Sequence, residues 1–248
     1  MSAIFKREFK AYFTSPIGFV IISLFSLISI FLFFANNLAG NTMDLSGYFT
    51  SVIILYAIIV PLITMKLMSE EKRQKTDQCL LTSPISLTKI VLGKFLSAFA
   101  FFSITLSFPI IFALILNAYQ PIELWVFIGN IVGMLLLGSA YVAIGLFISS
   151  LTENQAVAAV GSLVTILLFI ATQLLTYLVS GLYTKIPGLS LLTSNENVNT
   201  VINYVAVIPR YSNFAIGIFN LADALYFFSI AAVFIFLTVR VLEKRRWS

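Results

Sequence analysis

The chain has 248 residues, 60% of them hydrophobic and 10% charged, with a mean hydropathy of +1.02. Soluble domains carry roughly 25% charged residues, so this composition excludes a soluble domain and predicts an all-α polytopic membrane protein. The chain has no histidine and one cysteine, which excludes an intrachain disulfide and histidine-dependent nucleophilic catalysis, and no residues have metal-ligand spacing. The net charge of +5 is not a sign of nucleic-acid binding, because the positions of the basic residues matter more than their sum.

The first 14 residues predict a basic amphipathic helix that lies in the membrane interface. Aromatic side chains share one helical face and basic side chains lie on the other. The two groups are Phe5, Phe9, Tyr12 and Phe13, and Lys6, Arg7 and Lys10. A signal peptide is the weaker interpretation, because the apolar run that follows is too long and no clear cleavage site ends it.

Six apolar runs are long enough to cross a hydrocarbon core of about 30 Å. They cover residues 17–34, 48–68, 86–116, 124–148, 155–179 and 222–241. Ser86 is a plausible N-cap of the third run. Residues 180–221 form the longest segment that does not span, and we expect one or two short helices there in the outer leaflet.

The fourth run contains four glycines and one amide side chain. Small residues let helices approach closely in lipid, and packing within the chain is favoured over a seam between two copies. Asn130 is expected to face protein, since an unpaired amide in lipid is costly. The glycines are Gly129, Gly133, Gly138 and Gly145.

With six spans, all lysines and arginines except Lys185 and Arg210 lie on the side of the two termini. The positive-inside rule makes that side the cytoplasm, so we expect a multi-pass membrane protein with both termini in the cytoplasm. No span has a charged residue near its centre, which disfavours an ion-coupled transporter. Gly93-Lys94 also lacks the surroundings of a phosphate loop, so the energy for any transport must come from another chain.

Residues 69–86 form a polar segment, densely charged, between the second and third runs. We expect a short helix over 72–81, which ends before Ser83-Pro84 because proline disfavours helix at the residue before it. A charged surface helix with a few apolar residues is suited to docking on a soluble partner. An ordinary loop with a basic flank is the alternative.

Four segments resemble the ABC-2 permeases, and most of all their GldF-like, gliding-associated group. They are KREFKAYFTSPIGFV, SEEKRQKTDQCLLTSPISLTKIVLGK, AIGLFISSLTENQAVAA and FLTVRVLEKRRW. The chain departs from that group at four positions. Lys75 stands where glycine is common, and Tyr211 where histidine is common. Gln78 and Lys89 each stand where an acidic residue is common.

The resemblance implies one ABC-2 type transmembrane domain over residues 1–248 that acts as the permease subunit of a bacterial ABC exporter. The expected partners are two copies of an ABC ATPase, a second permease of the same or a related sequence, a GldG-like auxiliary subunit and the lipid membrane, with no nucleic acid. ATP and Mg would bind the ATPase, and this chain would hold no cofactor or metal. The alternative is a structural membrane anchor of an envelope or motility complex that moves no solute.

The resemblance also assigns two sets of residues. Coupling to the ATPase would use the 72–81 helix and the turn between the fourth and fifth spans: Glu71, Lys72, Arg73, Asp77, Leu80, Leu81, Ser149 and Glu153. A conduit between the second and fifth spans would be apolar, with four polar groups that orient an amphipathic cargo: Thr64, Thr165, Thr172 and Gln173. The alternative for the hydroxyls is a hydrogen bond to their own helix.

Overall fold

The computed structural model describes residues 1–40, 42, 44–76, 78, 85–119, 121–183 and 206–247, without the side chains of 173–183 and 247. The described residues form helices and no strand. Six helical stretches are long and apolar enough to cross a membrane, which confirms the predicted spans. They are Pro16–Leu38, Ser46–Arg73, Leu87–Asn117, Leu124–Leu151, Gln155–Thr172 and Leu221–Arg246.

Helix α1 (Ser2–Thr14) lies beside the first span and packs against α6 (Leu87–Thr105). Ser15 has an extended backbone and Pro16 begins α2 (Pro16–Phe33), so the chain changes direction between the two helices. Tyr12 anchors α1: its hydroxyl donates to the Ile63 carbonyl at 3.0 Å, and its ring stacks on Phe101. At the far end of the bundle, a π-helical turn (η1, Phe34–Leu38) continues α2.

The second span consists of α3 (Ser46–Thr64) and α4 (Lys66–Arg73), which meet at Met65. A turn over Gln74–Thr76 closes α4. The Lys75 amide donates to the Lys72 carbonyl at 3.2 Å and the Thr76 amide to the Glu71 carbonyl at 3.0 Å. Lys75 has φ +57°, so this end is a Schellman motif with lysine in the left-handed position that glycine usually takes.

This turn corrects the predicted 72–81 helix. Lys72 and Arg73 belong to the last turn of α4, and the chain leaves the helix at Gln74. The prediction is therefore correct for Lys72 and Arg73 and wrong for Gln74–Thr76, which form a turn. Asp77, Leu80 and Leu81 lie outside the described residues.

The third span breaks at Leu106, between α6 and α7 (Ser107–Asn117). Pro109 explains the break, because it has no amide to donate to the carbonyl four residues earlier. Ser86 takes the extended N-cap conformation before α6, but its side chain makes no capping hydrogen bond.

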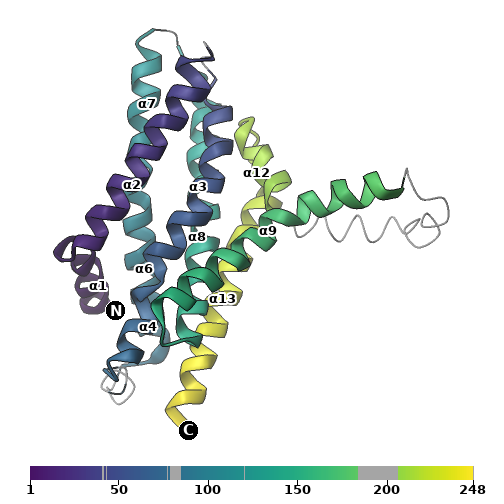
Figure 1. The fold of residues 1–248 in the computed structure, drawn as a ribbon. Helices are drawn as coiled ribbons and strands as arrows, with labels where there is room; N and C mark the ends of the chain where they lie inside the picture. Colours follow the sequence, from purple (N-terminus) through teal and green to yellow (C-terminus); the bar gives the residue numbers. More distant parts are fainter. Residues whose placement is uncertain are drawn as a thin grey trace.

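Helix α8 (Leu124–Leu151) lies at the centre of the bundle and packs against α3, α4, α6, α9, α12 and α13. Figure 1 shows α9 (Gln155–Tyr183) leaning away from the other spans, while α13 (Leu221–Trp247) follows α8. The short helix α12 (Val207–Ala215) lies in the segment for which the sequence predicts short helices. Both termini lie at one end of the bundle (Figure 1). We call this end, with α1, α4 and the last turns of α13, the terminal face.

Candidate functional site

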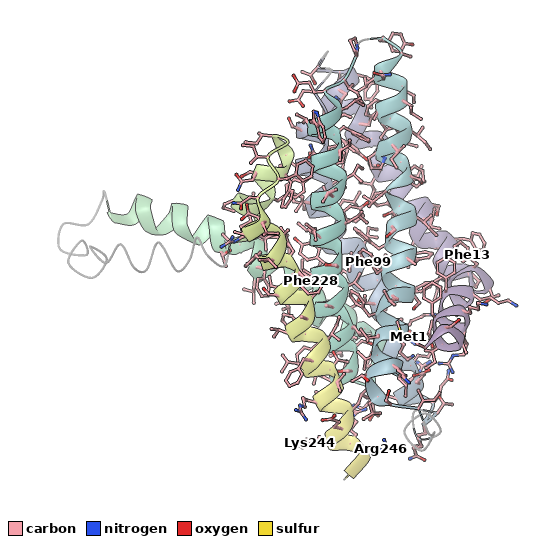
Figure 2. The ribbon with its side chains drawn as sticks, turned by 180° about the vertical axis from the view of Figure 1, so that it is seen from behind. Met1, Phe13, Phe99, Phe228, Lys244 and Arg246 are labelled. Carbon is pink, nitrogen blue, oxygen red and sulfur yellow. The ribbon has the colours of Figure 1, made fainter. Side chains whose placement is uncertain are left out.

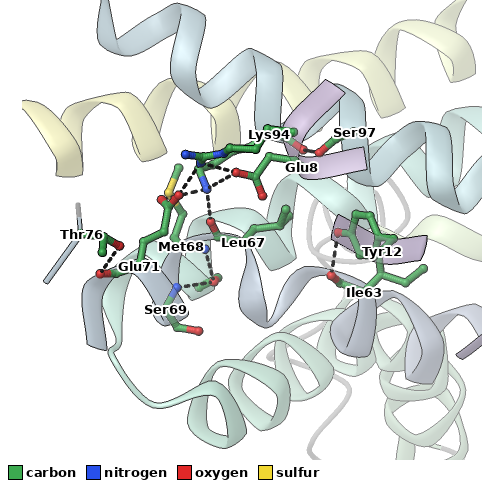
Figure 3. Close-up of polar contacts among 12 residues, drawn as sticks. Glu8, Tyr12, Ile63, Leu67, Met68, Ser69, Glu71, Thr76, Lys94 and Ser97 are labelled. Carbon is green, nitrogen blue, oxygen red and sulfur yellow. Dashed lines mark hydrogen bonds and ion pairs between the residues drawn. The ribbon is translucent and has the colours of Figure 1, made fainter. Parts of the chain in front are cut away.

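A buried lysine connects three helices at the terminal face. Lys94 is on the second turn of α6 and only 1% of its side chain is exposed. Its ammonium group donates to the Leu67 carbonyl at 2.6 Å and forms ion pairs with Glu8 at 3.1 Å and Glu71 at 2.8 Å (Figure 3). All three N–H groups of the ammonium therefore have acceptors. These acceptors come from α1 and α4, so Lys94 links both helices to the third span.

A second cation completes this group. Arg7 on α1 contacts Glu8 at 2.5 Å and Glu71 at 2.6 Å. Burial lowers the pKa of the Arg7 guanidinium, but the two carboxylates outweigh this and the net shift is upward. Two cations thus face two carboxylates, so their charges balance. Such pairing offsets the free energy that is lost when charged groups are removed from water. We call Arg7, Glu8, Glu71 and Lys94 the charge cluster.

On its other side, α4 contacts α8, and the hydroxyl group of Ser149 makes three hydrogen bonds between them. Ser149 on α8 accepts hydrogen bonds from the amides of Met68 at 3.1 Å and Ser69 at 3.2 Å, and donates to the Met65 carbonyl at 3.0 Å. The first amides of a helix have no partner within it, and a side-chain oxygen normally caps them from the preceding residue. Ser149 makes this cap from a neighbouring span, across the junction between α3 and α4.

The turn between α8 and α9 also contacts α4. Lys72 donates to the Leu151 carbonyl at 3.3 Å and lies 3.6 Å from the Glu153 carboxylate. Of the residues assigned to ATPase coupling, the structure thus gathers Glu71, Lys72, Ser149 and Glu153 around α4. Arg73, at the end of α4, is exposed. α4 is therefore attached to α1 and α6 on one side and to α8 on the other.

The sequence model of the ABC-2 family transporter proteins matches residues 2–247, nearly the whole chain. The chain belongs to this family. No curated protein matches it. The ABC-2 protein is thus a multi-pass membrane subunit of an ABC transporter, and its family is one of membrane transport subunits. Membership also implies an ABC ATPase as its partner.

Three of the four polar residues assigned to a conduit in this ABC-2 protein bond to their own helices. The hydroxyls of Thr64, Thr165 and Thr172 donate to the carbonyls of Val60, Gly161 and Phe169, at 3.0, 2.8 and 2.7 Å. Thr64 is fully buried between α3 and α8, whereas the other two are partly exposed on α9. The side chain of Gln173 lies outside the described residues. The three described hydroxyls are therefore hydrogen-bonded within their own helices, as the alternative interpretation expects, and the conduit stays a prediction.

The four glycines of α8 each face another helix of the same chain. A side chain at Gly129 or Gly133 would collide with Phe214 of α12. A side chain at Gly138 would meet the Phe102 ring of α6, and one at Gly145 would meet Thr64 of α3. The glycines thus let three neighbouring helices approach α8 closely.

Two buried polar contacts fix α12 in the ABC-2 protein. Asn130 donates to the Ala215 carbonyl at 3.2 Å and accepts from the Tyr211 hydroxyl at 2.8 Å. This confirms that Asn130 faces protein. The Asp223 carboxylate, also buried, accepts from Arg210 at 2.8 Å and from Asn213 at 2.6 Å. These bonds join α12 to α8 and α13.

The charge cluster as a set was not predicted from the sequence. Arg7 was expected on the basic face of the N-terminal helix, Lys94 among the basic residues of one side, and Glu8 had no predicted role. One signal was available: Glu8 is the only acidic residue among the first 40, and Lys94 lies inside an apolar run. A lysine in such a position needs an acidic partner, because an unpaired charge in the membrane is costly.

Proposed function

We propose that this ABC-2 protein is the permease subunit of a bacterial exporter and that α4 transmits ATP-driven movement from the ATPase to the spans. The attachment of α4 to its neighbours on both sides carries the proposal. Lys94 ties α4 to α1 and α6, and Ser149 ties it to α8. A displacement applied to the end of α4 would thus reach three other helices without a flexible joint.

The proposal requires the terminal face to be cytoplasmic. Basic residues gather there: α4 ends with Lys72 and Arg73, and α13 carries Lys244, Arg245 and Arg246 in its last turn. Cytoplasmic ends of membrane proteins are enriched in lysine and arginine, which supports this orientation. It places residues 69–86 and the α8–α9 turn where a soluble ATPase would meet them.

We assign ATPase docking to the segment after α4, with Leu80 and Leu81 as apolar anchors. Burial of one leucine contributes about 1.5–3 kcal/mol, or roughly 10- to 100-fold in affinity. An exposed charge pair contributes less than about 1 kcal/mol, so Arg73 should matter less than the leucines. Two such permeases, identical or related as in GldF-like systems, would enclose a path of apolar walls suited to an amphipathic cargo.

The test is purification through a tag on the permease, with measurement of the bound ATPase and its ATP hydrolysis. Leu80→Asp should release or uncouple the ATPase, while Arg73→Ala should retain most of both signals. Full co-purification and hydrolysis with Leu80→Asp would place docking elsewhere. If no ATPase binds even the unmodified chain, the structural membrane anchor becomes the better interpretation. Transport of a small hydrophilic solute by the reconstituted complex would contradict the apolar path.

A further inference from the structure

A groove of about 710 Å³ opens on the side of the bundle between α6, α8 and α13. Figure 2 looks onto this side, with Phe99 on α6 and Phe228 on α13. Its walls are apolar and include Leu92, Phe95 and Leu135. The volume lies in the range of about 300–1,000 Å³ that is typical of small-molecule sites.

The polar groups of the groove lie almost entirely at one end. Thr88, Arg240 and Glu243 line it at the terminal face, and the hydroxyl of Ser139 is already bonded to its own helix at 2.6 Å. From Thr88 to Phe99 the groove follows α6 for about 16 Å at ~1.5 Å per residue. One leaflet contributes about half of a ~30 Å hydrocarbon core. The groove therefore has the length of one leaflet, with its polar end at the interface.

This polar end is positively charged. The Arg240 side chain is 61% exposed, lies over the Phe236 ring and pairs with Glu243 at 2.7 Å. Three more basic residues follow on the same helix within the next two turns. Basic residues near a membrane surface each attract anionic lipid by about 1 kcal/mol.

We propose that the groove binds one anionic phospholipid from the leaflet at the terminal face. One acyl chain would lie between α6 and α13, and the phosphate would contact Arg240 and Thr88. A second copy of the chain fits this surface less well, because a two-fold interface would bring two basic ends of α13 together. This inference concerns a bound lipid and does not depend on the identity of the cargo.

The test uses the full-length chain in nanodiscs that contain phosphatidylglycerol with a photoreactive group midway along one acyl chain. Peptide mapping should find cross-links on the groove walls of α6 and α13. Ala232 lines the groove and is exposed, so Ala232→Trp should fill it and abolish these cross-links. Val233→Trp is the matched control, because this neighbour is exposed but does not line the groove. Ser139→Phe narrows the groove from the side of α8. This variant is used in place of Ala232→Trp if Ala232→Trp does not fold.

Arg240→Gln tests the preference for an anionic headgroup. Cross-linking by the phosphatidylglycerol probe, relative to a phosphatidylcholine probe, should fall about five-fold, the equivalent of ~1 kcal/mol. Lys10→Gln is the control: it removes an exposed basic residue of α1, away from the groove, and should leave this ratio unchanged. Cross-links spread evenly over exposed apolar residues, or unchanged in Ala232→Trp, would overturn the proposal. The proposal would also be overturned if two copies of the Ala232→Cys variant formed a disulfide with each other while the lipid probe did not label the groove. The groove would then be an interface between two copies of the chain.

Discussion

Replacement of Lys94 by methionine removes the centre of the charge cluster while it keeps the length of the side chain. The variant leaves Glu8 and Glu71 close together without the ammonium between them, and it leaves the Leu67 carbonyl without this donor. Breaking a buried ion pair by removing one partner costs about 3–5 kcal/mol. Arg7 still contacts both carboxylates, so we expect the lower end, about 3 kcal/mol.

For a chain of this size, 1 kcal/mol shifts the unfolding midpoint by roughly 2–4 °C, so Lys94→Met should lower it by about 6–12 °C. The measurement is the surviving folded fraction after heating in detergent, read by size-exclusion chromatography. Lys89→Met is the matched control: it removes an exposed lysine from the same helix and should change stability by less than ~0.5 kcal/mol.

A double variant separates charge from packing. With Lys94→Met in place, Glu71→Gln should recover part of the lost stability, because it removes the repulsion between two carboxylates that share Arg7 as their one remaining partner in the charge cluster. Loss of side-chain packing alone predicts no recovery. The reasoning is refuted if Lys94→Met unfolds at the same temperature as Lys89→Met, or if Glu71→Gln makes it less stable still.

Ser149→Ala should lower the free energy of unfolding by about 1–3 kcal/mol, because it leaves two amides and a carbonyl near the α3–α4 junction without this partner. Ser150→Ala is the control and should cost less, because it breaks only a bond to its own helix. Equal losses of thermal stability in the two variants would contradict the cap. Gly129→Ala should cost about 1–3 kcal/mol by displacing α12, because its new methyl group would collide with the Phe214 backbone carbonyl. Gly161→Ala should cost less, because the one atom it would meet is a side-chain methyl group of Ile148, at 3.0 Å; the measurement is again the unfolding midpoint. A single cysteine at Glu153 should escape an impermeant thiol reagent in intact cells, and its labelling would reverse the proposed orientation.

The spans could be predicted from the sequence because their signal is local. An apolar run such as 124–148 has few alternatives in a membrane, and α8 begins at the same residue, Leu124, and ends a few residues later, at Leu151. The inward position of Asn130 was also predictable, since its amide needs a partner wherever the span lies. That its partners are Tyr211 and the Ala215 carbonyl was not, because they come from a different helix.

The candidate site was harder to predict because its contacts join distant parts of the chain. Glu8 and Lys94 meet only after α1 docks against α6, and hydropathy does not indicate which faces of two helices will pack. The end of α4 was missed for a local reason. A glycine at position 75 would have signalled a helix end, but lysine takes the left-handed conformation there and hides the signal.

The cap made by Ser149 also gives the protein a reporter of its own. The hydroxyl uses its donor and both of its lone pairs on α4, so the Met68 and Ser69 amides stay shielded from water while the two helices remain in contact. Separation of α4 from α8 would expose these two amides to deuterium before the surrounding helices unfold. Amide exchange at two adjacent residues could thus follow the transport cycle without any label on the chain.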